Sequence, residues 1–145
     1  MNRRCFLQRA QGATAVAAAA SLGVPLSGCI GFHYARGTMQ DGRLVLQASQ
    51  FGGDRFLLVD APGFQLPLYV FRHDDGTYSA VSTRCMHRGC EVEPNAGHLV
   101  CPCHGSEYAN DGAVLKGPTR EPLRRYPLLV EGGNLVIDLS AGEAS

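Results

Sequence analysis

Two short segments that combine cysteine with histidine constrain this 145-residue chain more than any other feature. They read Cys85-Met86-His87-Arg88-Gly89-Cys90 and Cys101-Pro102-Cys103-His104-Gly105-Ser106. Each offers one thiol and one imidazole at close spacing, as Cys-x-His in the first segment and Cys-x-x-His in the second. Thiolates and imidazoles are ligands of zinc and of certain iron–sulfur clusters. The two segments together therefore predict a metal centre with two cysteine and two histidine ligands.

The two segments, continued by Ser106-Glu107-Tyr108, resemble the ligand loops of Rieske [2Fe–2S] proteins of the high-potential, disulfide-containing type. Such proteins occur in quinol–cytochrome c oxidoreductases and as small subunits of periplasmic oxidases, and the resemblance covers about residues 43–139. It implies one [2Fe–2S] cluster per chain, with two thiolates on one iron and two imidazoles on the other: Cys85 and Cys101, and His87 and His104. It also implies a disulfide between the loops and two hydroxyl donors to cluster sulfurs: Cys90 with Cys103, and Ser106 and Tyr108.

This ligand set favours electron transfer. An imidazole donates less negative charge than a thiolate, so an iron held by two imidazoles is reduced more easily. The reduction potential then rises to about −150 to +300 mV, against about −400 mV for a plant-type cluster held by cysteine alone.

Two other interpretations of the segments stay open. A structural zinc module would use the same four ligands, but it would leave the two further cysteines and the two hydroxyls without a role. A dioxygenase-type Rieske ferredoxin lacks the further cysteines and works in the reducing cytosol, where a disulfide does not persist.

The first 28 residues resemble an export signal. Asn2-Arg3-Arg4-Cys5-Phe6-Leu7-Gln8 is similar to the twin-arginine motif, and an alanine-rich stretch over residues 10–26 follows it. Leu26-Ser27-Gly28-Cys29 resembles a bacterial lipobox, whose cysteine is lipidated. We therefore expect export by a twin-arginine-like route and a lipid anchor on Cys29 at the periplasmic side of the membrane. Cleavage near residues 18–20 and an uncleaved helical anchor remain alternatives.

From Arg43 onward the sequence is typical of a β protein. Short apolar runs separated by turn residues lie at 44–46, 56–59, 68–71, 78–81, 128–130 and 135–137, and no stretch shows sustained helical periodicity. We expect an all-β fold over residues 43–141, an antiparallel sandwich or barrel of the Rieske type, with a small cluster-binding lobe inserted at about 85–115. Residues 29–42 are expected to form a tether. The formal net charge is zero, which argues against a nucleic-acid partner.

Two residues depart from the pattern common in quinol-oxidising relatives, Cys-Thr-His-Leu-Gly-Cys. Met86 replaces the threonine and Arg88 replaces the leucine at the loop tip, and burying an unpaired guanidinium in an apolar quinol pocket costs on the order of several kcal/mol. We therefore expect a one-electron carrier whose partner is a cytochrome or an oxidoreductase subunit. A Rieske subunit of a quinol–cytochrome c oxidoreductase or of a periplasmic molybdenum-type oxidase is the alternative. No nucleophile–base pair is apparent, so no independent catalytic site is predicted.

Overall fold

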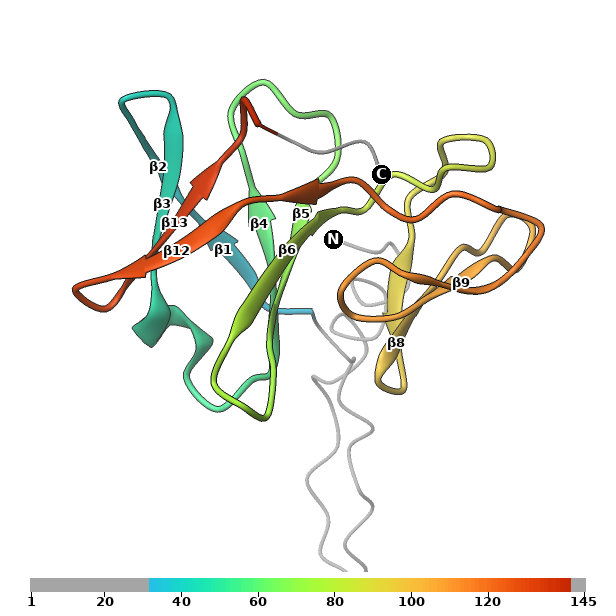
Figure 1. The fold of residues 1–145 in the computed structure, drawn as a ribbon, viewed down its shortest axis with the longest axis horizontal. Coiled ribbons are helices and arrows are strands. Elements are labelled where there is room, and N and C mark those ends of the chain that lie inside the picture. The colour runs from blue at the N-terminus through green and yellow to red at the C-terminus, as the bar shows by residue number, and fades with distance from the viewer. Residues whose placement is uncertain (1–31, 142–145) are drawn as a thin grey trace, which may run out of the picture. The chain divides into compact units, whose positions relative to one another are not determined.

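The computed structural model describes residues 32–141, and short strands dominate this part of the chain (Figure 1). In order, its elements are β1 (Tyr34–Arg36), β2 (Thr38–Gln40), β3 (Arg43–Gln47), the 3-10 turn η1 (Ala48–Phe51), β4 (Phe56–Asp60), β5 (Leu68–Arg72), β6 (Tyr78–Ser82), β7 (Glu93–Asn95), β8 (His98–Val100), β9 (Glu107–Tyr108), β10 (Val114–Lys116), β11 (Arg125–Tyr126), β12 (Leu128–Glu131) and β13 (Asn134–Asp138). The expected signal segment and the lipidation site at Cys29 lie outside the described residues.

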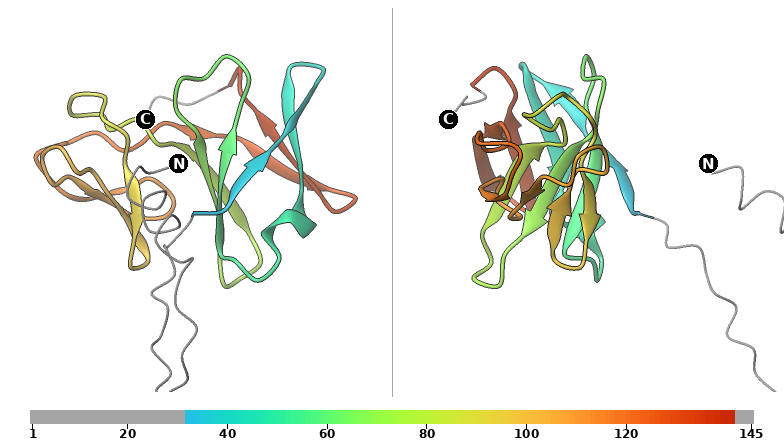
Figure 2. Two further views of the ribbon diagram at one scale, coloured as in Figure 1. Left: turned by 180° about the vertical axis from the view of Figure 1, so that it is seen from behind. Right: turned by 90° about the vertical axis from the view of Figure 1, so that its right-hand side faces the viewer.

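Three sheets are built from these strands. The central sheet has the order β1-β4-β5-β6-β11, the outer sheet β12-β13-β3-β2, and the lobe sheet β10-β9-β8-β7. Every pair of neighbours is antiparallel except β1 and β4, which run parallel. In Figure 1 and in the view from behind in Figure 2, the hairpin of β2 and β3 and the lobe with β8 and β9 lie at opposite ends of the molecule.

Alternate residues of the central sheet enter two separate cores. Leu57 and Val59 of β4 pack with buried residues of the outer sheet, such as Leu46. Leu58, between them, packs in a second core with residues of the lobe such as Leu99. Side chains of a strand alternate between the two faces of a sheet, so a strand covered on both faces is apolar throughout. The central sheet is therefore the layer that carries the lobe.

The lobe is inserted between β6 and β11, two neighbouring strands of the central sheet. Asn110 connects it to that sheet, because its side-chain Oδ1 accepts a hydrogen bond from the Tyr69 hydroxyl at 2.8 Å and its backbone carbonyl accepts one from Ser79 Oγ at 3.0 Å. A net hydrogen bond contributes about 0.5–1.5 kcal/mol, so these contacts fix the orientation of the lobe more than they stabilise the fold.

The structure confirms the all-β fold class, and a strand occupies each of the six apolar runs named from the sequence. The predicted tether needs correction, because residues 34–36 and 38–40 are strands and Ala35 is only 6 % exposed. Three-residue edge strands have too few positions to show an alternating pattern. Pairing with β4 and β3 defines them, and that pairing is not visible in the local sequence.

Candidate metal centre

The two cysteine–histidine segments fold into loops with the same backbone frame. In the first ligand loop, residues 85–90, the Cys85 N–H donates to the Cys90 carbonyl at 2.8 Å and the Gly89 N–H donates to the Cys85 carbonyl at 2.8 Å. The second ligand loop, residues 101–106, repeats both bonds: Cys101 N–H to the Ser106 carbonyl at 2.8 Å, and Gly105 N–H to the Cys101 carbonyl at 2.9 Å. Each loop is thus a closed six-residue turn with its cysteine ligand candidate at the first position.

A glycine in the left-handed region ends each turn. Gly89 has φ 79° and Gly105 has φ 75°, a conformation that costs a residue with a side chain about 1–2 kcal/mol. Glycine at the fifth position of both loops is therefore required by the shared frame.

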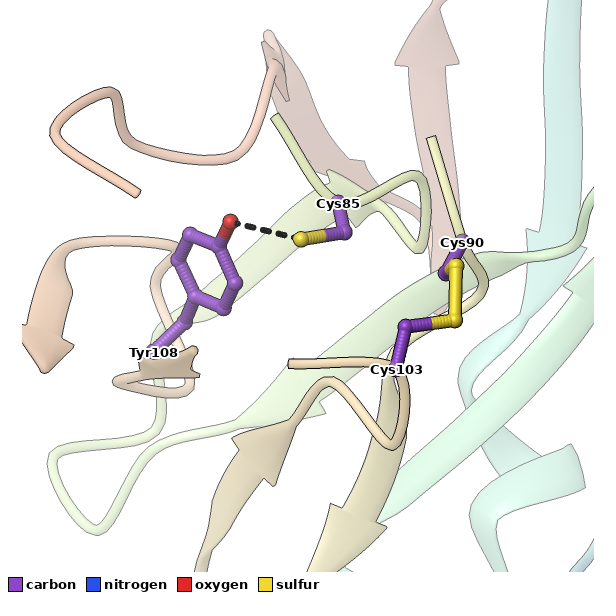
Figure 3. Close-up of a disulfide and its surroundings, with 4 residues drawn as sticks. All are labelled: Cys85, Cys90, Cys103 and Tyr108. Atoms are coloured by element: carbon purple, nitrogen blue, oxygen red, sulfur yellow. Dashed lines mark hydrogen bonds between the residues drawn. A yellow bond between two sulfur atoms is a disulfide. The ribbon is translucent and has the colours of Figure 1, made fainter. Parts of the chain in front are cut away.

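The two first-position cysteines are free thiols buried at the base of the loops. Cys85 is 2 % exposed and Cys101 is 1 % exposed. The Met86 N–H donates to the Tyr108 hydroxyl oxygen at 3.2 Å, which leaves the hydroxyl hydrogen free to donate to Cys85 Sγ at 3.3 Å (Figure 3). Tyr108 is itself fully buried, so it holds this donor in one place.

The two thiols differ in acidity. Burial acts to raise the pKa of the Cys85 thiol, but hydrogen bonds from the Tyr108 hydroxyl and the His87 N–H outweigh it and lower this pKa. Burial raises the pKa of the Cys101 thiol, and its hydrogen bond with Cys85 adds to the effect. Burial and the contact with Cys85 also raise the pKa of Tyr108, to about 12, so this phenol keeps its hydrogen at neutral pH. Cys85 is the thiol better prepared to act as a thiolate ligand.

The two histidines of the loops lie together. The rings of His87 and His104 are 4.8 Å apart between centroids and meet nearly at a right angle, with 88° between their planes. His104 is exposed, whereas His87 is half-buried and its Nδ1 is buried without a hydrogen-bond partner among the described residues. A buried ring nitrogen without a partner is costly unless it binds something, which suits a metal ligand.

The two further cysteines form a disulfide, as the family resemblance implied. Cys90 of the first ligand loop is bonded to Cys103 of the second, across a sequence separation of 13 (Figure 3). The sulfurs of Cys90 and Cys103 lie within 4.8 Å of Cys101 Sγ, but two of these three sulfurs are bonded to each other. That trio therefore provides a covalent clamp beside the site and no ion site of its own.

Ser106, the other expected hydroxyl donor, is fully buried at the last position of the second ligand loop. Its Oγ accepts a hydrogen bond from the Thr119 N–H at 3.2 Å, so the serine hydrogen is free to point elsewhere. Thr119 was missed from the sequence, although its backbone N–H binds Ser106 and its side chain hydrogen-bonds Tyr108. The signal that could have located it is the preceding Gly117-Pro118 pair, a turn signal in the chain that returns to the site.

The comparisons with known proteins decide the family. A family model described as the Rieske [2Fe-2S] domain matches residues 42–127, more than half of the chain. The chain belongs to the Rieske [2Fe-2S] domain family. Its cofactor is therefore a [2Fe–2S] cluster, and the residues present suit it: two buried free thiols, a buried unpartnered imidazole nitrogen and a neighbouring imidazole. This finding replaces the zinc interpretation.

Curated relatives of this Rieske domain include iron-sulfur subunits of cytochrome b6-f complexes. The cytochrome b6-f complex iron-sulfur subunit of Chlorobaculum tepidum is 34 % identical over 90 residues, which cover 56 % of this chain and 50 % of that protein. The cytochrome b6-f complex iron-sulfur subunit of Synechococcus sp. (strain JA-3-3Ab) is 45 % identical over 94 residues, 62 % of this chain and 53 % of that protein. The chain spans about half the length of these two relatives.

A solved structure shares the fold at similar sequence identity. The plasma membrane Rieske protein PetC3 from Synechocystis PCC 6803 has a TM-score of 0.56 and is 35 % identical, with 63 % of this chain and 93 % of that chain covered. Within residues 32–141 of the present protein, no helix is long and apolar enough to cross a membrane.

Proposed function

We propose that this Rieske domain is a one-electron transfer protein whose cluster is held by the first-position cysteines and the two histidines: Cys85, Cys101, His87 and His104. The thiolates would hold one iron and the imidazoles the other. When bound, the cluster supplies a site that takes up and releases one electron. The observation that carries this proposal is the pair of matching loops, which bring two free buried thiols and two adjacent imidazole rings to one end of the lobe.

The surrounding residues act on charge and access. The Tyr108 hydroxyl donates to the Cys85 sulfur, and Ser106 has a free hydroxyl hydrogen beside the second loop. Donors to ligand sulfur favour the more negative, reduced state and raise the potential. His104 is exposed, so its ring edge offers a short route by which a protein partner exchanges the electron.

Cluster analysis of the purified protein tests the proposal. The protein should contain two irons and two acid-labile sulfides per chain, and its reduced form should give an anisotropic EPR signal with a low average g, as expected for a cluster with two histidine ligands. Its potential should lie in the range of about −150 to +300 mV. Stoichiometric zinc without sulfide, or a potential near about −400 mV, would contradict the ligand assignment.

A subunit role in a quinol-oxidising complex is the second candidate, since the curated relatives described above are subunits of cytochrome b6-f complexes. The exposed Arg88 at the tip of the first loop argues against insertion into an apolar quinol pocket. Reduction of the oxidised protein by a soluble quinol analogue, with and without membranes from the native host, separates the candidates. A complex subunit should be reduced by quinol only when its membrane partner is present, whereas a free carrier should accept electrons from a soluble protein donor.

We also propose the arrangement along the chain as a twin-arginine export signal over residues 1–28, a lipid anchor on Cys29 and, at the periplasmic side, a Rieske domain over residues 34–141 that includes β1 and β2. The motif Arg3-Arg4 and the lipobox ending at Cys29 support this arrangement. Replacing both arginines by lysine should block export, and Cys29→Ala should stop lipid processing. A Cys29→Ala protein that stays membrane-bound with an intact N-terminus would instead support an uncleaved anchor.

A further inference from the structure

A cleft of about 780 Å³ opens beside the first ligand loop. Three segments form its walls: the connection between β4 and β5, the first ligand loop with the residue before it, and the chain leading into β11. The lining residues used below are Arg84, Met86, Gly89 and Glu121. The cleft thus reaches the loop that carries His87 without including the buried thiols.

Exposed arginines line this cleft or lie next to its lining residues in the chain. Arg84 lines it, and its Nε lies 3.2 Å from the point that a Cβ on Gly89 would occupy. Arg88 directly precedes Gly89, and Arg120 directly precedes Glu121, another lining residue. All three arginines are exposed, and Glu121 is the single acidic residue among those that line the cleft.

The described acidic side chains that form ion pairs do so at other places on the surface. These pairs are His33–Asp54, Arg55–Asp74, His98–Glu107, Lys116–Glu107 and Arg125–Asp111. None of the ion pairs within residues 32–141 involves Arg84, Arg88 or Arg120. Three exposed guanidinium groups outnumber the carboxylate of Glu121 at this cleft and create a local positive field beside the site, although the whole chain is formally neutral.

We propose that this basic rim, formed by Arg84, Arg88 and Arg120, docks the acidic face of a protein redox partner against the exposed edge of His104. The inference rests on the proposed electron-transfer function and adds the chemistry of the partner. Guanidinium groups pair bidentately with carboxylates, which suits them to orienting such a partner. Met86, which lines the same cleft and is 40 % exposed, supplies an adaptable apolar contact. An anionic lipid surface would meet the same charges, and the test includes it.

Two forms of one haem protein test the sign of the interaction. Mitochondrial cytochrome c is strongly basic, and succinylation of its lysines turns it into an acidic protein with the same haem. The reduced Rieske protein gives one electron to the ferric haem, which becomes ferrous. We expect the succinylated form to be reduced faster than the native form and its rate to fall as ionic strength rises, because screening weakens attraction. The native form should show the opposite salt dependence.

Single variants assign the effect to the basic rim. Arg88→Gln and Arg84→Gln should each weaken binding of succinylated cytochrome c to the oxidised protein by about two- to fivefold, the range of one exposed charge pair. Arg43→Gln removes the same charge from β3 in the outer sheet, at the opposite end of the molecule from the lobe in Figures 1 and 2, and should leave binding unchanged.

Three outcomes would overturn the proposal. They are native cytochrome c binding as tightly as the succinylated form, Arg43→Gln weakening binding as much as Arg88→Gln, and tighter binding to vesicles containing phosphatidylglycerol than to the acidic protein. Iron, sulfide and EPR measurements on the same samples keep this test separate from the electron-transfer proposal. A protein with a normal cluster but no charge preference refutes the docking surface alone.

Discussion

The first ligand loop, residues 85–90, and the second, residues 101–106, have the same pair of backbone hydrogen bonds but carry different side chains at four equivalent positions. The second position holds Met86 in one loop and Pro102 in the other. The third position is His87 in the first loop and the disulfide cysteine Cys103 in the second. The fourth is Arg88 in the first and His104 in the second. The sixth is the disulfide cysteine Cys90 in the first and Ser106 in the second.

This comparison explains the unequal spacing of the cysteine–histidine segments. The disulfide joins the sixth position of the first loop to the third position of the second, so the second loop cannot use its third position for a ligand. Its histidine stands one residue later, at the exposed fourth position. Arg88 occupies the same position in the first loop and is exposed too, which places a positive charge where the other loop presents His104. Two loops with the same backbone frame thus differ in the exposure of their histidines: His87 is half-buried and His104 is exposed.

Removal of a first-position cysteine should have the largest effect in either loop. Cys85→Ser and Cys101→Ser each take away one of four proposed ligands, so iron and labile sulfide should fall to near zero in both. Metal analysis and visible absorption of the purified variants measure this loss. Met86→Leu, which changes an exposed neighbour of Cys85 and removes no ligand, is the control and should retain the cluster. A stoichiometric cluster in either serine variant would remove that cysteine from the ligand set.

Breaking the disulfide should be the next largest effect and should be the same from either side. Cys90→Ala and Cys103→Ala open the same covalent link, and closing a loop of this length is worth about 3 kcal/mol of unfolding free energy. Denaturant unfolding of both single variants and of the double variant measures it. The double variant should lose no more than either single one, because there is one bond to break. Additive losses would mean that the cysteines stabilise the loops through separate contacts.

Much of this arrangement follows from the sequence. The short apolar runs between turn residues predict the strands, and the family resemblance predicts the disulfide and the closeness of the two histidines. The shared frame of the two loops could not be predicted from the unequal Cys-x-His and Cys-x-x-His spacings. It depends on backbone hydrogen bonds and on positive φ at Gly89 and Gly105. The contact of the Thr119 N–H with Ser106 could not be predicted for the same reason, since a backbone N–H has no mark in the sequence.

The two hydroxyl donors should tune the reduction potential in the same direction. Tyr108→Phe removes a donor to the first loop, and Ser106→Ala removes the hydroxyl at the end of the second. A hydrogen bond to a charged group is worth about 1.5–3 kcal/mol, and 59 mV corresponds to about 1.4 kcal/mol for one electron. Potentiometry should therefore find each potential lowered by about 50–130 mV. Tyr126→Phe, a buried tyrosine of the other core, should leave the potential unchanged. An unchanged potential in Ser106→Ala would show that only the first loop is tuned by a hydroxyl.

Replacing the fifth-position glycines by alanine should destabilise the two loops unequally, and the difference in unfolding free energy should be smaller than the effects above. Gly89→Ala and Gly105→Ala both force a side chain into positive φ, at about 1–2 kcal/mol each. A Cβ at Gly89 would also come within 3.2 Å of Arg84 Nε, whereas one at Gly105 would meet no atom within 4 Å. Unfolding measurements should find Gly89→Ala the less stable variant. Arg84→Ala introduced beside Gly89→Ala should remove the difference, and equal losses without it would mean that the arginine moves aside freely.

The smallest effects on stability should come from replacing the glutamates that follow the two loops. The two replacements should change stability in opposite directions. Burial, with the nearby Glu93 carboxylate, raises the pKa of Glu91 after the first loop. The hydrogen bond from Lys116 to Glu107 after the second loop outweighs partial desolvation and lowers the pKa of that carboxyl. A raised folded-state pKa means that protonation favours folding, so the contribution of Glu91 is present in acid and lost as pH rises through its folded-state pKa. The contribution of Glu107 is present above its unfolded-state pKa and lost as pH falls through its folded-state pKa.

Urea unfolding of variants with glutamine at these two positions tests the opposite pKa shifts of Glu91 and Glu107. At pH 7 Glu91→Gln should raise the urea midpoint slightly, because it removes an ionised carboxylate from a site that disfavours charge. Glu107→Gln should lower the midpoint slightly, because Lys116 loses its charged partner at 2.8 Å. Both differences should shrink toward acid pH, where the wild-type carboxyls are neutral as the amides are. The other member of each pair, Glu93 or Lys116, is exposed, so the shifts should also shrink in high salt. Shifts of the same sign in the two variants would show that the loops end in equivalent electrostatic surroundings and would break the contrast drawn from their neighbours.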